Sequence, residues 1–282
     1  MGQQVAGDQG MKARLGFLLG PPLLWLVVIY LGSIAVLLVS SFWTVNGFTG
    51  AVEPTFTLQN YATLVTDPLY GTVALRTLLV ALGVTLIDAV VAFPMALYIA
   101  KVARPSRRAL YLVAVTTPLW ASYLVKAYAW RILVEPGGPI AVATGGYTPG
   151  FGLPATIMTL AYLWLPYMII PVYAGFDRVP DSFFEASYDL GASTWRTIRT
   201  VAFPLVFPAI VAGSIFTFAL SFGDYIAVGI VGGKTQLLAN LIYGQLVTAN
   251  NQPLAAALSV IPLIAVVLYL LAVRRTGALE NV

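Results

Sequence analysis

The chain has 282 residues, of which 59% are hydrophobic and 9% are charged, and its mean hydropathy is +0.87. A soluble domain carries about 25% charged residues, so this chain cannot cover itself with a water-compatible surface. It contains no cysteine and no histidine, which excludes disulfides, thiolate or imidazole metal sites, and catalysis by Cys/His or Ser/His pairs. The net charge is +4, and the basic residues lie in short loops beside apolar runs. Membrane orientation explains this placement better than a nucleic-acid partner does. The composition therefore predicts an all-α, polytopic protein of the lipid bilayer, with no metal site.

Six apolar runs are long enough to cross a membrane as helices, at about 15–39, 70–100, 109–134, 153–176, 201–228 and 254–273. We therefore expect a transmembrane domain over residues 15–275, flanked by polar tails over 1–14 and 276–282. The first run is too long for a secretory signal, lacks an Ala-x-Ala site and ends in Phe42-Trp43, so we expect it to be retained. Ala209, Gly213 and Thr217 recur at four-residue spacing in the fifth run, which predicts close contact between helices.

The basic residues are distributed unequally between the two sides of this alternation. Eleven of them fall on one side: Lys12, Arg14, Lys101, Arg104, Arg107, Arg108, Arg178, Arg196, Arg199, Arg274 and Arg275. The other four are Arg76, Lys126, Arg131 and Lys234. Because loops rich in Lys and Arg stay in the cytoplasm, we expect both termini and residues 177–200 to be cytoplasmic.

Residues 177–200 form a polar segment that still has the pattern of folded helix. Ser182 and Glu185 fit a capping box at the start of a first short helix. Gly191 suits the left-handed position that ends it, and Ser193 or Thr194 can cap a second helix. Both helices keep apolar side chains that need something to pack against. The segment is thus predicted to be two short helices, joined at a glycine, that another protein grips.

This segment resembles the signature loop of binding-protein-dependent ABC importer permeases. The pattern of that family is Glu-Ala-Ala, three residues, Gly, nine residues, then Ile-x-Leu-Pro. This chain has Glu185-Ala186-Ser187, three residues, Gly191, nine residues, then Val201-Ala202-Phe203-Pro204. The substitutions at Ser187, Val201 and Phe203 are small changes of size, and the spacing is kept.

The resemblance implies a type I ABC importer permease domain with six transmembrane helices and a cytoplasmic coupling helix. That helix would dock on an ATP-hydrolysing subunit, and the residues that carry the match are Glu185, Ala186, Ser187, Leu190, Gly191 and Pro204. The implied partners are ABC ATPase subunits, a second homologous permease and an extracytoplasmic solute-binding protein. This chain would bind no cofactor itself, since ATP and Mg belong on the ATPase and no Gly-x-x-x-x-Gly-Lys-Ser/Thr loop is present.

A narrower resemblance is to spermidine/putrescine permeases, and to the first of their two permease subunits. It rests on Asn60-Tyr61, Phe93-Pro94-Met95-Ala96, the run from Thr117-Pro118-Leu119-Trp120 to Trp130, Leu190-Gly191-Ala192-Ser193, Phe222-Gly223-Asp224-Tyr225 and Asn240-Leu241-Ile242. Lys126 stands where we expect Arg, which keeps the charge and loses the planar hydrogen bonding. The resemblance implies import of polyamines across the cell membrane.

A polyamine in a partly desolvated path needs aromatic faces and spaced carboxylates. Trp120, Tyr123 and Trp130 fall within one broad face of the third helix. They supply either an aromatic surface near the outer half of the path, or an interfacial belt and ordinary helix packing. Asp224 and Tyr225 lie at an expected break near the outer end of the fifth span. Asp88, near the middle of the second span, is the deepest acid and needs compensation there. It either pairs transiently with a substrate ammonium, or has a structural partner in this chain or in the second permease, or is protonated at that depth.

Three alternatives remain open. The first is an ABC permease for another solute, such as ferric iron, thiamine or sulfate, although an anion path should favour basic residues over Asp88. The second is a secondary transporter, which would have no use for a docking loop. The third, an intramembrane enzyme, lacks any recognisable nucleophile motif.

Overall fold

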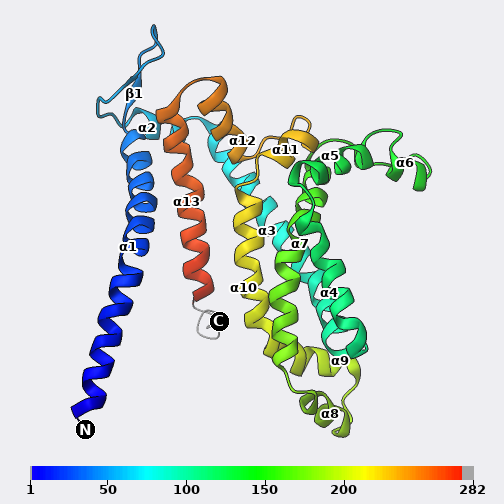
Figure 1. The fold of residues 1–282 in the computed structure, drawn as a ribbon. Helices are drawn as coiled ribbons and strands as arrows, with labels where there is room; N and C mark the ends of the chain where they lie inside the picture. Colours follow the sequence, from blue (N-terminus) through cyan, green and yellow to red (C-terminus); the bar gives the residue numbers. More distant parts are fainter. Residues whose placement is uncertain (1, 275–282) are drawn as a thin grey trace.

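The computed structural model describes residues 2–274. They form a set of helices standing side by side, with a small hairpin at one end (Figure 1). The long helices are α1 (Gly2–Ser40), α3 (Pro68–Leu97), α7 (Leu153–Arg178), α10 (Phe203–Phe222) and α13 (Gln252–Arg274). The shorter helices are α2 (Gln59–Thr66), α4 (Pro105–Trp120), α5 (Tyr123–Val134), α6 (Pro139–Ala143), α8 (Asp181–Asp189), α9 (Thr194–Thr197), α11 (Ile226–Val231) and α12 (Leu238–Tyr243). Strands β1 (Thr44–Val45) and β2 (Val52–Glu53) pair antiparallel.

Three π-helical turns extend these helices: η1 (Tyr98–Val102) follows α3, η2 (Ile198–Ala202) precedes α10, and η3 (Gly244–Thr248) follows α12. We call the end with α8 and α9 the loop end, and the end with β1 and β2 the hairpin end (Figure 1). α1 begins at the loop end and already includes residues of the predicted polar tail as helix. The predicted tail over 276–282 lies outside the described residues.

The prediction of an all-α protein with six spans is confirmed, with one correction in the third span. Among residues 2–274, five helices are long and apolar enough to cross a membrane, and a sixth crossing requires α4 and α5 together. These two helices bend by 94° at Ala121 and Ser122, whose backbones are extended (ψ 143° and 134°). Pro118 weakens the end of α4 because it has no N–H to donate. The expectation that the third span over 109–134 is a single helix is therefore wrong.

The fifth predicted span is also shorter than expected at the hairpin end of the molecule. α10 stops at Phe222, and α11 begins only after Gly223, Asp224 and Tyr225. The break itself was predicted from the sequence. The run over 201–228 therefore contains one crossing helix and the start of a separate short helix.

α3, α7 and α10 form the centre of the molecule, and each of them packs on the other two. Small residues bring α7 and α10 together. A Cβ added to Gly213 would lie 2.8 Å from the sulfur of Met168, and one added to Gly175 would lie 2.6 Å from Cβ of Ala209. The predicted close helix contact at Ala209 and Gly213 is confirmed.

Replacing Gly175 by alanine is expected to lower the melting temperature of the purified protein by several degrees. The new methyl group would overlap Cβ of Ala209, so the backbones of α7 and α10 must separate, at a cost of about 1–3 kcal/mol. Gly83→Ala is the matched control, because an added Cβ there meets no atom within 4 Å and alanine favours helix by about 1 kcal/mol. Equal melting temperatures for the two variants would show that this helix contact can relax freely.

Candidate functional site

A cavity of about 270 Å³ opens at the hairpin end, where α5, α7, α10 and the start of α11 meet. Its lining combines one carboxylate with three large aromatic side chains. The lining residues are Tyr123, Trp164, Ala219, Leu220, Gly223, Asp224, Tyr225 and Ile226. The break after α10 forms one wall, because it turns the chain aside before α11 begins.

Asp224 is held in place by bonds from two directions. The Tyr123 hydroxyl donates to Asp224 Oδ2 over 2.5 Å, and the Ala227 amide donates to Asp224 Oδ1 over 2.9 Å. The Ala227 amide also lies 3.1 Å from the Tyr123 hydroxyl oxygen. Asp224 is only 6% exposed. These bonds fix α5 against the start of α11 and orient the carboxylate before any ligand arrives.

The aromatic rings around this carboxylate are themselves stacked. Trp164 lies 5.9 Å from the ring of Tyr123 at an interplanar angle of 30°, and Tyr225 lies 5.0 Å from the ring of Tyr243 at 17°. Trp164 Nε1 is buried and has no hydrogen-bond partner among the described residues. A fixed carboxylate beside aromatic faces suits an organic cation, which gains both ionic and cation–π attraction.

The structure brings three of the predicted path residues together and leaves two apart. Tyr123, Asp224 and Tyr225 share the cavity, whereas Trp120 ends α4 on the other side of the bend and is 89% exposed. Because the third span is bent, the expected single aromatic face through Trp120, Tyr123 and Trp130 does not exist. Trp130 packs against Tyr162 instead, with ring centroids 5.6 Å apart.

Asp88 lies inside the helix core and is not among the residues that line the cavity. It is completely buried on α3, and neither carboxylate oxygen has a hydrogen-bond partner among the described residues. The structural partner that the sequence analysis allowed for is thus not found within residues 2–274.

Trp164 was missed by the sequence reasoning. The only signal in the sequence was the position of this tryptophan in an apolar span, two residues before Pro166. A buried indole N–H needs a hydrogen-bond acceptor, so a tryptophan there can mark a polar site.

At the loop end, residues 177–200 form the two short helices that the sequence predicts. α8 and α9 are joined at Gly191, whose φ of +76° is left-handed, as expected. The Ser193 hydroxyl accepts a hydrogen bond from the Arg196 amide, which confirms the cap of the second helix. The hydroxyls of Ser187 and Thr197 lie 2.9 Å apart and tie α8 to the end of α9.

The predicted capping box of the first helix is wrong. α8 begins at Asp181 with Pro180 as its N-cap, and no side chain caps it. Pro180 lies in extended backbone (ψ 140°), so the helix starts two residues earlier than expected and Ser182 falls within it. Glu185 is therefore free of the capping role and lies exposed on the helix.

The loop end exposes large apolar side chains on both short helices. Phe183 is 51% exposed, Tyr188 47%, Leu190 89% and Trp195 71%. Ala186 is exposed beside Glu185, and Pro204 lies in the first turn of α10, directly after the π-helical turn η2. Apolar groups gathered on a polar loop are typical of a surface that binds another protein.

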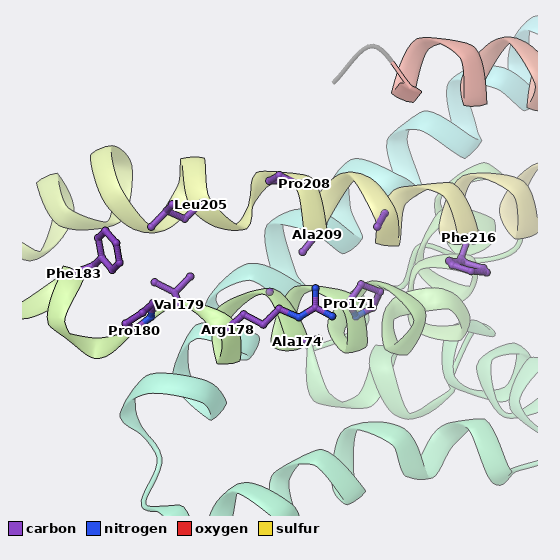
Figure 2. A pocket seen from close by; sticks show the side chains of 12 residues that line it. Pro171, Ala174, Arg178, Val179, Pro180, Phe183, Leu205, Pro208, Ala209 and Phe216 are labelled. Carbon is purple, nitrogen blue, oxygen red and sulfur yellow. The ribbon is translucent and has the colours of Figure 1, made fainter. Parts of the chain in front are cut away.

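A groove of about 470 Å³ runs between α7 and α10 and ends at the start of α8 (Figure 2). Its walls are mostly apolar, with Pro171 and Ala174 on one side and Leu205 and Pro208 on the other. Arg178 extends along the α7 side (Figure 2). The groove lies along the contact between the two helices, close to the point where both connect to residues 177–200.

If residues 177–200 are the coupling loop that the resemblance implies, replacing Gly191 by valine should reduce solute uptake at least fivefold while the protein remains folded in the membrane. An added Cβ would meet no atom within 4 Å, so the effect comes from the left-handed backbone, which a β-branched residue resists by roughly 1–2 kcal/mol or more. Transport into vesicles by the assembled complex measures the loss. Asn tolerates this conformation, so Gly191→Asn should retain most of the uptake, and equal activity of the valine variant would show that the turn can adopt another form.

Comparison with known proteins gives consistent matches. The family model described as "Binding-protein-dependent transport system inner membrane component" matches residues 16–275. The chain is 40% identical over 284 residues to the Escherichia coli "Inner membrane ABC transporter permease protein YdcU", covering 94% of this chain and 90% of that protein. It is 33% identical over 246 residues to the Salmonella typhimurium "Spermidine/putrescine transport system permease protein PotB", covering 82% of each.

Two solved structures share the fold. One is a bacterial ABC transporter involved in the import of the acidic polysaccharide alginate, with a TM-score of 0.67 and 16% identity over 96% of this chain and 99% of that chain. The other is the MetNI methionine ABC transporter in an inward facing conformation, with a TM-score of 0.56 and 20% identity over 75% of this chain and 97% of that chain. At these identities the likeness concerns the helical architecture alone.

Proposed function

We propose, from the premise that this chain belongs to the family of binding-protein-dependent transport system inner membrane components, that it carries polyamines such as spermidine and putrescine into the cytoplasm. As a member of that family, the chain is a multi-pass inner-membrane permease subunit of an ABC importer and is not itself catalytic. Its contribution is a path for the solute and a link to the machinery that drives transport.

The observation that carries the substrate proposal is the cavity at Asp224. A flexible polycation needs carboxylates and aromatic faces spaced along its path, and no single site that binds it too tightly to release it. Asp224 supplies the charge, and Tyr123, Trp164 and Tyr225 supply the faces. The similarity to a permease named for spermidine and putrescine supports the same substrate class. Asp88 is a further acid that the cation could meet if the helices around it separate during transport.

The second part of the proposal concerns the loop end. α8 would dock in a groove of a partner ATPase, which binds ATP and Mg, and the match at Glu185, Ala186, Ser187, Leu190, Gly191 and Pro204 supports this role. The exposed apolar side chains of α8 and α9 support it too. The basic residues at this end favour a cytoplasmic position, with both termini on the same side. A second homologous permease and an extracytoplasmic solute-binding protein would complete the complex.

Uptake by the reconstituted complex tests the substrate proposal. Proteoliposomes would contain this chain with its ATPase, second permease and solute-binding protein from the same organism, and radiolabelled spermidine would be the tracer. We expect ATP-dependent accumulation that unlabelled putrescine competes away and that thiamine, ferric iron and sulfate do not affect. Accumulation of one of those three solutes with none of spermidine would overturn the polyamine assignment and leave the permease role intact.

A further inference from the structure

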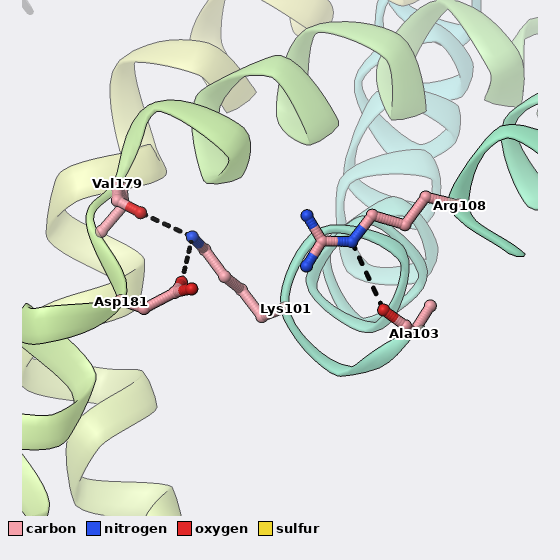
Figure 3. Close-up of polar contacts among 5 residues, drawn as sticks. All are labelled: Lys101, Ala103, Arg108, Val179 and Asp181. Atoms are coloured by element: carbon pink, nitrogen blue, oxygen red, sulfur yellow. Dashed lines mark hydrogen bonds and ion pairs between the residues drawn. The ribbon is translucent and has the colours of Figure 1, made fainter. Parts of the chain in front are cut away.

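Lys101 joins two elements at the loop end that are far apart in the sequence. It lies in η1, at the end of α3, and its side chain is only 13% exposed. Its ammonium donates to the carbonyl oxygen of Val179 over 2.5 Å and to Asp181 Oδ1 over 2.7 Å (Figure 3). Val179 directly follows α7, and Asp181 begins α8. One side chain thus binds the end of a core helix to the junction between α7 and α8.

Two further features strengthen this contact. The Lys101 ammonium lies 5.7 Å from the ring centroid of Phe184, over its face. The hydrogen bond and the charge of Lys101 hold the pKa of Asp181 below its usual range, so Asp181 stays ionised. The Asp181 side chain is 71% exposed, so the shielded Lys101 side chain and its bond to the Val179 carbonyl define the contact more than the ion pair does.

The position of Lys101 matters because of how α8 is connected. Along the chain, α8 leads back to α7 and forward through α9 and η2 to α10. α3 is the third member of the central core, and nothing in the sequence order joins it to α8. On the other side of η1, Arg108 Nε donates to the carbonyl oxygen of Ala103 over 3.3 Å (Figure 3). Lys101 therefore connects α8 directly to α3, the one core helix to which α8 is not joined by the order of elements along the chain.

We propose that Lys101 is a positioning residue that makes the end of α3 and α8 move as one body, so that displacement of α8 reaches all three core helices. This inference rests on the proposed role of α8 as the coupling helix. Without the bond, α8 would act on α3 only indirectly, through the packing of α3 against α7 and α10. Uptake would then fall relative to ATP hydrolysis, while the partner ATPase remained bound.

The first test measures the geometry and needs no transport. The chain has no cysteine, so Val102→Cys and Asp189→Cys can carry two spin labels, one on η1 and one at the end of α8. Pulsed electron–electron double resonance on the purified protein in lipid nanodiscs gives the distribution of distances between the two labels. We expect a narrow distribution with Lys101 present, at least twofold broadening with Lys101→Met, and a narrow one again with Lys101→Arg. An unchanged distribution in the methionine variant would overturn the connection.

The second test measures uptake per ATP hydrolysed by the assembled complex. We expect Lys101→Met to lower this ratio at least threefold and Lys101→Arg to retain most of it, since arginine also donates to a carbonyl and a carboxylate. Arg104→Met is the matched control, as it removes one positive charge from the same loop, and its ratio should stay at the wild-type value. Broader spin-label distances with an unchanged ratio would overturn the positioning role.

Different results would overturn the coupling role of α8 and the positioning role of Lys101. If the wild-type chain binds no ATPase, the proposed coupling function falls, whatever the spin labels report. If the ATPase binds and Glu185→Lys uncouples transport while Lys101→Met does not, the coupling helix stands and the role of Lys101 is wrong.

Discussion

Replacing Glu185 by lysine is expected to reduce uptake by the assembled complex at least tenfold while the protein inserts and folds normally. Glu185 is exposed and plays no part in capping α8, so the change should alter the free energy of unfolding by less than about 0.5 kcal/mol. It reverses a charge in the middle of the proposed docking surface, where like charges or unpaired groups oppose binding. Thermal melting of the subunit and copurification of the ATPase, measured beside uptake, separate folding from docking.

Asp177→Lys is the control for this result, because it makes the same charge change in the last turn of α7, outside α8. We expect it to retain at least half of the wild-type uptake. Normal uptake by the Glu185 variant would remove the argument that α8 transmits the motion.

Asp224→Asn is expected to lower polyamine uptake tenfold or more, mainly through weaker apparent affinity. The change removes the charge at the cavity and keeps a side chain of the same size. Losing a hydrogen-bonded charge costs about 1.5–3 kcal/mol, and each 1.4 kcal/mol corresponds to about a factor of ten. Initial rates of spermidine uptake over a range of concentrations measure the effect. Glu135→Gln makes the same kind of change at the end of α5, outside the cavity lining, and should leave the rates unchanged.

A second variant separates charge from structure at this site. Tyr123→Phe removes the hydrogen bond to Asp224 Oδ2 and leaves the carboxylate in place. If the charge attracts the substrate, this variant should lose much less uptake than Asp224→Asn. Equal losses in both would mean that the bond between α5 and α11 matters and the charge does not.

The sequence predicts features that depend on local chemistry. Apolar length places the crossing helices, and Gly191 takes the left-handed conformation because a glycine after a short helix most readily adopts it. The break at Gly223 likewise follows from residues adjacent in the chain. These features need no information about distant contacts.

The features that were predicted wrongly depend on contacts between distant residues. The bend between α4 and α5 is held by Tyr123, whose hydroxyl binds Asp224 at a separation of 101 residues. Trp164 joins the cavity only because α7 packs beside α5 and α10. Similarly, Asp181 is fixed by Lys101, 80 residues earlier, so the start of α8 could not be read from the Ser182 and Glu185 pattern alone. Periodicity and capping rules consider only residues that are close in the sequence, so they cannot predict contacts between residues that are far apart in it.

The helical core connects the cavity at the hairpin end with α8 at the loop end. A cation would be received at the cavity around Asp224, and α8 would deliver the motion that opens and closes the path. α3, α7 and α10 connect these ends, and their close packing makes them suited to move together.

The most direct test of this account is ATP hydrolysis by the complex in lipid, with the solute-binding protein and one solute added at a time. If this chain is the coupling permease of a polyamine importer, spermidine or putrescine should stimulate hydrolysis severalfold, while thiamine, ferric iron and sulfate should not. The stimulation should disappear with Glu185→Lys in this chain. Failure of any ATPase to associate with the wild-type chain, or stimulation that ignores polyamines, would contradict the account.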